Sequence, residues 1–238
     1  MIPPQKFTAR LEEVTPHTDK FIQYAFELES PHTMVFQAGQ YVSLKVAETG
    51  ERRSYSICST PAIDHGFELL VDISPQGLGS KFLQNLAIGA SVEVLAPLGH
   101  FVISDQGEKA IVMVATGSGI TPFYSMISDL LQNKKDQRSI TLYWGLRYVT
   151  DLFWTEELEN LAEVFHNFHF YPTLTQPVPE WTLSTGRVTN LLEVHNFEPQ
   201  TGFYLCGNQS MIDDCQKLLL AKDVASSYIH HESFTTTP

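Results

Sequence analysis

The spacing of apolar residues changes near Gly107, and this change constrains the fold more than any other feature of the chain. Before Gly107, apolar and polar residues alternate in short runs such as 42–46, 67–73 and 92–94, with turn residues between them. Such alternation is typical of strands that bury one face. A single helix is expected, over residues 80–88. The first part of the chain therefore predicts an antiparallel Greek-key β-barrel.

After Gly107, apolar runs alternate with segments of helical spacing. Strands are expected at 109–115, 140–146, 168–174, 203–206 and 228–231, and helices at 121–133, 151–164, 186–195 and 211–221. Elements that alternate in this way favour a parallel sheet with helices on both faces. We therefore predict a barrel domain over residues 1–104 and a five-stranded, doubly wound domain over residues 105–238.

The composition limits the partners of the chain. Only 15 of the 238 residues are Lys or Arg and the formal net charge is −12, which argues against nucleic-acid binding. The longest uninterrupted apolar run is Ala110–Ala115, far shorter than the roughly 20 residues that a membrane helix needs. The first residues also lack the basic and then apolar pattern of a secretion signal. We expect a cytoplasmic monomer that binds neither nucleic acid nor membrane.

The cysteine count bears on redox chemistry. The chain has three cysteines, Cys58, Cys206 and Cys215, whereas a plant-type iron–sulfur cluster needs four thiolates. Electrons that leave a redox group on this chain are therefore expected to pass to another molecule. The close histidine pairs, His166/His169 and His230/His231, have no carboxylate or cysteine at metal-ligand spacing, so no metal site is predicted.

Two motifs in the first part combine groups that suit a flavin nucleotide. Arg53, Tyr55 and Ser56 supply a cation for a pyrophosphate, a ring for stacking and a hydroxyl within four positions. Gly77–Ser80 leads into the predicted helix, whose first N–H groups can bind phosphate. The alternatives are an exposed strand end and an ordinary surface helix with Ser80 as its N-cap.

Two further motifs follow predicted strands of the parallel sheet, where such sheets bind ligands. Gly117 and Gly119 would let the backbone approach a pyrophosphate, and Pro122 suits the first turn of a helix. The run Cys206–Met211 follows a later strand. The alternatives are a tight turn and, for Cys206, a small core residue.

The four motifs together, in this order and spacing, resemble the signature set of the ferredoxin-NADP reductase superfamily of flavoenzymes. This resemblance implies that Arg53 neutralises the pyrophosphate of FAD, that Tyr55 stacks on the isoalloxazine and that Ser56 hydrogen-bonds near flavin N5. It implies flavin contacts for Arg53, Ser54, Tyr55, Ser56, Val71, Gly77, Gly79 and Ser80. It implies nicotinamide-nucleotide contacts for Thr116, Gly117, Gly119, Thr121, Pro122, Arg147, Arg187, Cys206, Gly207 and Met211.

The resemblance leaves the choice of nucleotide open between NADP and NAD. Arg147 and Arg187 could bind a 2′-phosphate, and on this ground we favour NADPH. Gln176, however, stands where NADPH-selective relatives commonly have arginine, and the following segment looks like that of NADH-using oxygenase reductases. Near the C-terminus, Glu232 is expected to approach the flavin, and Phe234 either covers the flavin ring or packs in the core.

The reaction that these positions support is hydride transfer from nicotinamide C4 to flavin N5, with Ser56, Cys206 and Glu232 as the catalytic residues. We expect a ferredoxin-NADP reductase-like enzyme that exchanges electrons with a ferredoxin or flavodoxin. The alternatives are a reductase of free flavins, a stand-alone reductase component of an oxygenase, and a non-catalytic nucleotide-binding electron-transfer subunit of a larger complex.

Overall fold

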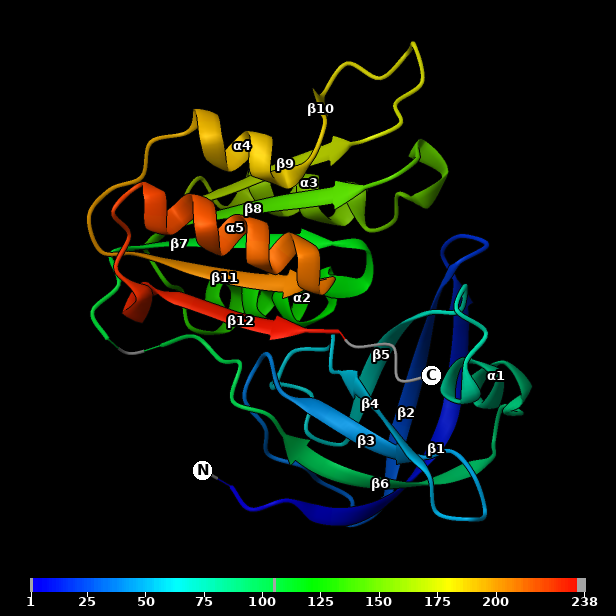
Figure 1. The fold of residues 1–238 in the computed structure, drawn as a ribbon. Coiled ribbons are helices and arrows are strands. Elements are labelled where there is room, and N and C mark those ends of the chain that lie inside the picture. The colour runs from blue at the N-terminus through cyan, green and yellow to red at the C-terminus, as the bar shows by residue number, and fades with distance from the viewer. Residues whose placement is uncertain (1, 105, 235–238) are drawn as a thin grey trace. The chain divides into compact units, whose positions relative to one another are not determined.

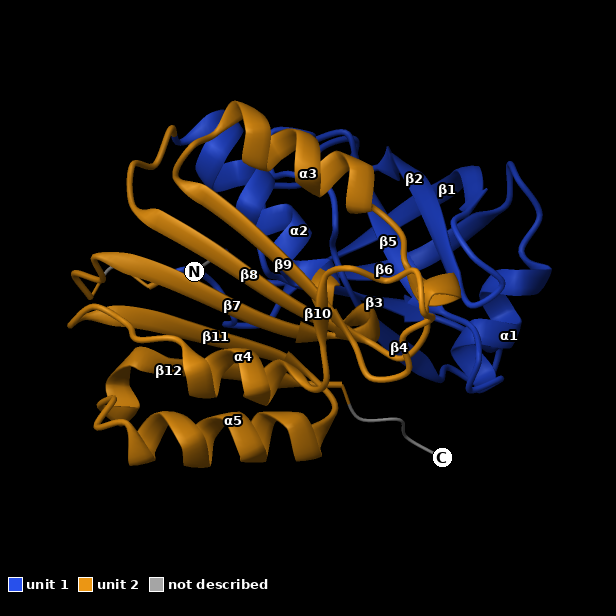
Figure 2. Cartoon of the chain, turned by 90° about the horizontal axis from the view of Figure 1, so that it is seen from above, with its two compact units in different colours: residues 1–103, 121–134, 238 blue, residues 104–120, 135–237 orange. Residues whose placement is uncertain are grey.

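A computed structural model describes residues 2–104 and 106–234 of the chain (Figure 1). The chain forms two compact units, coloured separately in Figure 2. The first contains residues up to Ile103 together with Thr121–Lys134. The second contains Ser104–Ile120 and the described residues from Lys135 onward. The first unit is therefore interrupted in sequence, because a segment of 14 residues that follows the start of the second unit packs with the first.

The first unit is built on an antiparallel six-stranded sheet, as the alternating pattern predicts. Its strands are β1 (Gln5–Pro16), β2 (Phe21–Ser30), β3 (Tyr41–Lys45), β4 (Arg52–Ser56), β5 (Gly66–Asp72) and β6 (Ser91–Leu98). Their order is β4-β3-β6-β1-β2-β5, and a bridge between Ile57 and Leu69 joins the two outer strands. The bridge closes the sheet into a barrel, and the side chains of alternate residues, such as Val42 and Leu44, fill its interior.

Helix α1 (Leu78–Asn85) is the helix predicted in this part of the chain, but it begins earlier than residue 80. Its N-cap is Gly77, and Ser80 already lies within the helix, so the alternative with Ser80 as N-cap is wrong. The prediction failed because serine is a favoured cap in general, whereas here the extended residue before the first turn is a glycine without a side chain.

The second unit contains a parallel sheet in the order β10-β9-β8-β7-β11-β12. Its strands are β7 (Ala110–Thr116), β8 (Ser139–Leu146), β9 (Phe168–Leu174), β10 (Ser184–Thr185), β11 (Thr201–Gly207) and β12 (Ile229–Ser233). The prediction of a parallel sheet is confirmed, but the described chain has one strand more than the five predicted. The extra strand, β10, is two residues long and polar, so it leaves no apolar pattern in the sequence.

The helices of this part follow the predicted order. Helices α3 (Thr155–Val164), α4 (Val188–Val194) and α5 (Gln209–Ala221) belong to the second unit, and Figure 2 shows α4 and α5 on one face of its sheet and α3 on the other. Short 3-10 turns occur at Gly117–Ile120, Val149–Asp151 and Ser226–Tyr228. Helix α3 begins at Thr155 rather than at the predicted residue 151, because Trp154 adopts a left-handed conformation with φ 53° that interrupts the helix.

Helix α2 (Thr121–Ser128) continues as a π-helical segment, Asp129–Asn133, and belongs to the first unit. Among the described residues, none of the helices combines the length and apolar character that a membrane crossing requires.

Candidate functional site

The first candidate site lies on strand β4. Arg53 and Tyr55 are two residues apart on this strand, so both side chains point to the same face. Tyr55 packs against the barrel core, and burial raises the pKa of its hydroxyl to about 12. The phenol therefore stays neutral at physiological pH, and its ring offers an uncharged surface for stacking.

Gly79 brings helix α1 against these two side chains. A Cβ atom at position 79 would lie 2.1 Å from the hydroxyl oxygen of Tyr55 and 2.9 Å from Cγ of Arg53. Both distances are shorter than real carbon contacts, so a side chain at this position would displace Tyr55, Arg53 or the helix. The glycine turn and the Arg53–Ser56 motif therefore form one structural site.

The first turn of helix α1 offers backbone N–H groups to this site. Its N-cap, Gly77, makes no side-chain cap, and Ser80 Oγ donates to the Gly77 carbonyl oxygen at 3.1 Å. The first N–H groups of a helix lack partners within the helix, and the helix dipole adds positive potential there. This arrangement suits a phosphate group.

The two neighbouring arginines of β4 have different roles. Arg52 forms an ion pair with Glu93 at 2.6 Å and also donates to Ser43, so it links β4 to strands β6 and β3. Arg53 donates to the carbonyl oxygen of Arg52 at 2.9 Å, and no carboxylate of the described chain forms an ion pair with it. Arg53 can therefore offer its charge to an anionic ligand.

The other residues expected at a flavin are placed as follows. Ser56 is 6% exposed at the end of β4, whereas Ser54 is exposed. Val71, on β5, is 3% exposed and belongs to the apolar core of the barrel. The structure therefore brings together Arg53, Tyr55 and the Gly77–Ser80 turn, with Ser56 on the same strand, while Val71 is a core residue.

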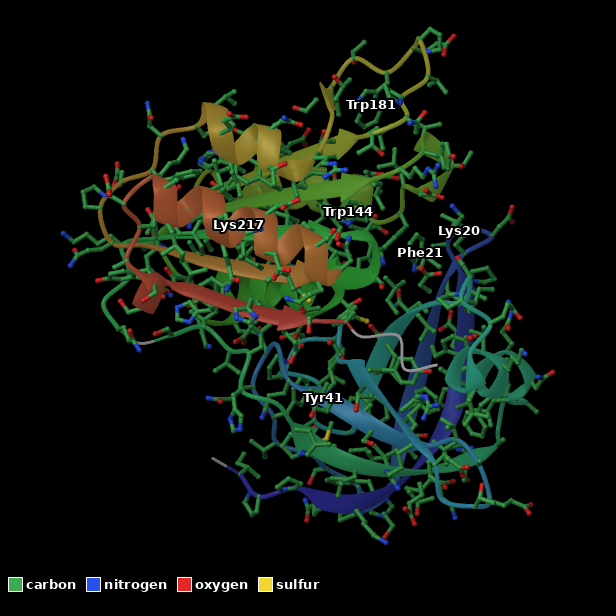
Figure 3. The ribbon with its side chains drawn as sticks, in the orientation of Figure 1. Lys20, Phe21, Tyr41, Trp144, Trp181 and Lys217 are labelled. Atoms are coloured by element: carbon green, nitrogen blue, oxygen red, sulfur yellow. The ribbon has the colours of Figure 1, made fainter. Side chains whose placement is uncertain are left out.

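The second candidate site lies at the carboxyl ends of β7 and β11. Gly117 adopts a left-handed conformation with φ 54°, and a Cβ atom there would meet nothing within 4 Å. Trp144 of β8, labelled in Figure 3, holds this turn by donating from Nε1 to the Gly117 carbonyl oxygen at 3.0 Å. The turn is thus fixed from one side and open on another.

Gly119 packs directly on the end of β11. A Cβ atom at position 119 would lie 2.3 Å from the carbonyl oxygen of Cys206 and 2.9 Å from Cα of Gly207. At Gly207, a Cβ atom would lie 2.2 Å from Oγ1 of Thr116 and 2.9 Å from Cε of Met211. The two glycine-containing motifs, far apart in the sequence, therefore meet at this edge of the sheet.

Asn208 organises the start of helix α5, a role that the sequence reasoning did not assign. Its Oδ1 accepts from the backbone N–H of Met211 at 2.9 Å, and its Nδ2 contacts Thr116 Oγ1 at 3.4 Å. Asparagine before a helix is a common N-cap, so the signal was present in the sequence. The cap orients the helix whose first turn follows Cys206 and Gly207.

Cys206 and Glu232 are paired neighbours on strands β11 and β12. Cys206 is fully buried, and burial raises the pKa of its thiol well above the ordinary value. Burial also raises the pKa of the Glu232 carboxyl, to about 7. Oε2 of Glu232 is buried and has no hydrogen-bond partner among the described residues. A buried carboxyl without a partner is costly, so this atom suggests a site for a ligand or for a proton.

Three further predicted residues lie in two places, two at the start of helix α2 in the first unit and one after β12 in the second unit. Thr121 and Pro122 are buried and begin helix α2, while the backbone N–H of Phe234 donates to the Gly207 carbonyl oxygen at 3.0 Å. Phe234 is 36% exposed and is therefore not a core residue.

The two arginines considered for a 2′-phosphate are both exposed. Arg147 lies over the ring of Tyr148 at 5.1 Å, and Arg187 is 3.7 Å from the carboxylate of Asp214. An exposed ion pair at this distance is weak, so Arg187 can exchange Asp214 for another anion.

These two sets of residues fit two different nucleotides. Arg53, Tyr55 and the first turn of α1 supply a cation, a ring and N–H donors, and Gly79, where a Cβ atom would clash with Tyr55, lets this turn lie against both side chains. The turn at Gly117 and Gly119 and the unpaired Glu232 oxygen suit a second nucleotide beside β11.

Comparison with known protein families agrees with this assignment. The oxidoreductase FAD-binding domain family matches residues 8–103, and the oxidoreductase NAD-binding domain family matches residues 113–217. The Gly77–Ser80 turn lies within the first of these ranges and the Gly117–Ile120 turn within the second.

Several individual proteins are similar to the chain. The reductase component DmpP of phenol 2-monooxygenase from Pseudomonas sp. (strain CF600) is 34% identical over 209 residues, which cover 85% of this chain. The chain spans only 59% of the length of that relative. NADH-cytochrome b5 reductase 1 from Dictyostelium discoideum is 30% identical over 212 residues, covering 87% of this chain and 74% of that protein.

Among solved structures, a ferredoxin NADP+ reductase from Neisseria gonorrhoeae with bound FAD and NADP matches with a TM-score of 0.82 and 25% identity. The match covers 98% of this chain and 99% of that one. The order of a barrel followed by a parallel sheet is therefore shared over nearly the whole length of both chains.

Proposed function

Because the chain belongs to the ferredoxin-NADP reductase superfamily of flavoenzymes, we propose that it oxidises NAD(P)H through a bound FAD and passes the electrons to a ferredoxin or flavodoxin. The observation that carries this proposal is the close approach of Gly79 to Tyr55 and Arg53. It places the first turn of α1, which we propose binds phosphate, beside the Tyr55 ring and the Arg53 guanidinium, which donates to a backbone carbonyl oxygen. In this proposal the electrons pass from the flavin to a separate partner molecule.

FAD and the nicotinamide nucleotide, when bound, supply the chemistry of hydride transfer. In this proposal, Arg53 and the first turn of α1 bind the flavin pyrophosphate, and Tyr55 orients the ring. The Ser56 hydroxyl donates a hydrogen bond that orients the reactive edge of the flavin. Gly117, Gly119 and the capped start of α5 bind the nucleotide phosphates. Cys206 excludes water from the site.

Glu232 holds a proton at this site in our proposal. With a pKa of about 7, its carboxyl is half protonated near neutral pH. A carboxyl with such a pKa can act both as proton donor and as proton acceptor.

The visible spectrum of the purified protein tests the proposed function. We expect a yellow protein whose absorbance near the flavin maximum bleaches under anaerobic conditions when NADPH or NADH is added. Titration with each nucleotide separately determines the preference, for which NADPH remains our prediction. A colourless protein that does not take up FAD, or a yellow protein that neither nucleotide bleaches, would contradict the proposal.

A second candidate is a reductase component of an oxygenase, which the similarity to the phenol 2-monooxygenase reductase favours. The electron acceptor distinguishes the two functions. Reduction of a ferredoxin or flavodoxin in a coupled assay supports the first function. Activity that appears only with an oxygenase component supports the second.

Replacing Ser56 with alanine is expected to retain FAD but to slow hydride transfer by about 10- to 100-fold, since one donor at the reacting atoms is lost. Stopped-flow bleaching of the flavin measures this rate. Ser91, an exposed serine of β6, supplies the control variant Ser91→Ala, which should react like the parent. A rate for Ser56→Ala equal to that of Ser91→Ala would remove Ser56 from the mechanism.

The raised pKa of Glu232 predicts a pH-dependent stability. Its folded-state pKa of about 7 lies above the ordinary value of 4.5, so the folded protein keeps this proton at pH values where the unfolded chain loses it. The contribution to stability is complete below pH 4.5 and is lost as the pH rises to 7. It amounts to about 3 kcal/mol.

Urea unfolding between pH 4.5 and pH 8 measures this contribution. Glu232→Gln should lack this part of the decline in the free energy of unfolding, whereas the exposed control Glu163→Gln should keep it. The same pH slope in both variants would show that another group is responsible.

A further inference from the structure

Helix α2 packs on the barrel unit through two buried side chains. Phe123 and Met126 are both fully buried, and the ring of Phe123 lies 5.7 Å from that of Phe101. A Cβ atom at Gly39, whose φ is +100°, would lie 2.3 Å from Cε of Met126 and 2.0 Å from the Phe101 carbonyl oxygen. The helix is therefore fitted closely to the loop before β3 and to the segment after β6.

A buried hydrogen bond adds a directional link. Ser125 Oγ donates to the carbonyl oxygen of Ser59 at 2.6 Å, with the two residues 0% and 4% exposed. Ser59 itself is held in place, because its Oγ accepts from the backbone N–H of Glu68 at 3.1 Å. At the other end of the helical segment, Asn133 Nδ2 donates to Thr60 Oγ1 at 2.6 Å.

The residues bound by these two links follow the flavin strand directly. Ser59 is three positions after Ser56, and the backbone N–H of Ile57 donates to the Gln40 carbonyl oxygen at 3.0 Å. Gln40 is the neighbour of Gly39, on which Met126 packs. The segment after Ser56 is therefore connected to helix α2 both through Ser59 and through the Gly39 loop.

The opposite end of helix α2 continues the glycine turn of the second candidate site. Thr121, its first residue, follows Ile120 of the Gly117–Ile120 turn without any linker. Thr121 and Ser125 lie in one continuous α-helix, about one turn apart, so we expect a displacement at Ser125 to move Thr121 as well. The contact at Ser59 is thus placed to set where the start of the helix lies relative to β4.

We propose that Ser125 is a positioning residue for hydride transfer: its bond to Ser59 fixes the start of helix α2 relative to the flavin strand. This inference rests on the proposed function. The Ser125 hydroxyl touches neither cofactor. It acts by holding Thr121, at the start of helix α2, in a fixed place relative to β4, and hydride transfer is sensitive to small displacements near the reacting atoms.

The test is anaerobic stopped-flow reduction of the FAD-loaded Ser125→Ala variant over a range of NADPH or NADH concentrations. We expect the limiting rate of reduction to fall about 10-fold, because a small misplacement of reacting atoms is costly. The nucleotide dissociation constant should stay within about 3-fold of the parent, because the substitution removes no contact between the Gly117–Ile120 turn and the end of β11. FAD content should equal that of the parent.

Ser128→Ala is the matched control, since Ser128 is a buried serine on the same helix and should react at the parental rate. Asn133→Ala is a second test variant at an exposed position, so it keeps the core intact, and we expect its limiting rate to fall about 3-fold. If Ser125→Ala fails to fold, the rate for Asn133→Ala decides: a rate equal to that of Ser128→Ala overturns the proposal.

Hydrogen exchange supplies a readout that is independent of activity. In Ser125→Ala, amide exchange should accelerate both in residues 57–60 and in residues 121–134, whereas Ser128→Ala should not change residues 57–60. An unchanged limiting rate in Ser125→Ala, or exchange that accelerates only in the helix, overturns the positioning role. Absence of bleaching in the parent itself would instead contradict the proposed function, and the exchange comparison would still test the link.

Discussion

Replacing Gly79 with alanine is expected to abolish stable FAD binding. The added Cβ atom would lie 2.1 Å from the Tyr55 hydroxyl oxygen and 2.9 Å from Arg53 Cγ, so either these side chains or the start of helix α1 must move. Overpacking of this kind costs about 1–3 kcal/mol, and the displaced groups are those that we assign to the flavin. The resulting loss of affinity is on the order of 100-fold.

The flavin dissociation constant, measured by fluorescence titration of the protein freed of FAD, checks this prediction. Gly89→Asn is the matched control in the same unit, because a Cβ atom at position 89, whose φ is +86°, would meet nothing within 4 Å and asparagine tolerates this conformation. We expect its affinity to stay within about 3-fold of the parent, a difference below 1 kcal/mol. Equal affinities for Gly79→Ala and Gly89→Asn would exclude the close approach at Gly79 as part of the flavin site.

Replacing Gly119 with alanine is expected to produce the complementary defect, loss of reduction by NAD(P)H with FAD retained. Its Cβ atom would lie 2.3 Å from the Cys206 carbonyl oxygen and 2.7 Å from the carbonyl carbon. Both are backbone atoms of β11, which is held between β7 and β12, so the glycine turn has to move instead. We expect the second-order rate of flavin reduction to fall by about 100-fold.

The control for this variant is Gly107→Asn. Gly107 also has a positive φ, 82°, a Cβ atom there would meet nothing within 4 Å, and asparagine tolerates this conformation. It should be reduced at the parental rate. A thermal melt and the FAD content separate a local defect from unfolding. Parental reduction kinetics in Gly119→Ala would mean that the Gly117–Ile120 turn does not bind the nucleotide.

Much of the architecture could be predicted because apolar periodicity reports which faces are buried. Alternation in residues such as Val42 and Leu44 indicates a barrel wall, and the apolar run of β7 indicates a strand covered on both faces. Strand β10 could not be predicted in this way, because its two polar residues pair through backbone groups alone. The start of α3 depends on the φ of Trp154, which no periodicity encodes.

The sequence predicts the motifs of the candidate sites, but it does not predict the contacts that their residues make in the fold. The sequence places Gly79 near a helix start. Only the fold shows why this position requires glycine: a side chain there would clash with Tyr55. The same holds for Glu232, which the fold pairs with Cys206 and whose Oε2 is buried without a hydrogen-bond partner among the described residues. The bond between Ser125 and Ser59 joins residues 66 positions apart, and a hydroxyl and a carbonyl group leave no pattern in the sequence.

The interrupted course of the first unit restricts how such a reductase can be taken apart or recombined. A gene fragment that stops at residue 104 encodes every barrel strand but omits α2, and so uncovers the surfaces of Phe101 and Gly39 on which Phe123 and Met126 pack. A chimaera that joins this barrel to the C-terminal half of another reductase meets a foreign helix at the same place. Exchange at a single crossover therefore breaks a packed interior, whereas a graft that carries residues 121–134 along with the barrel preserves it.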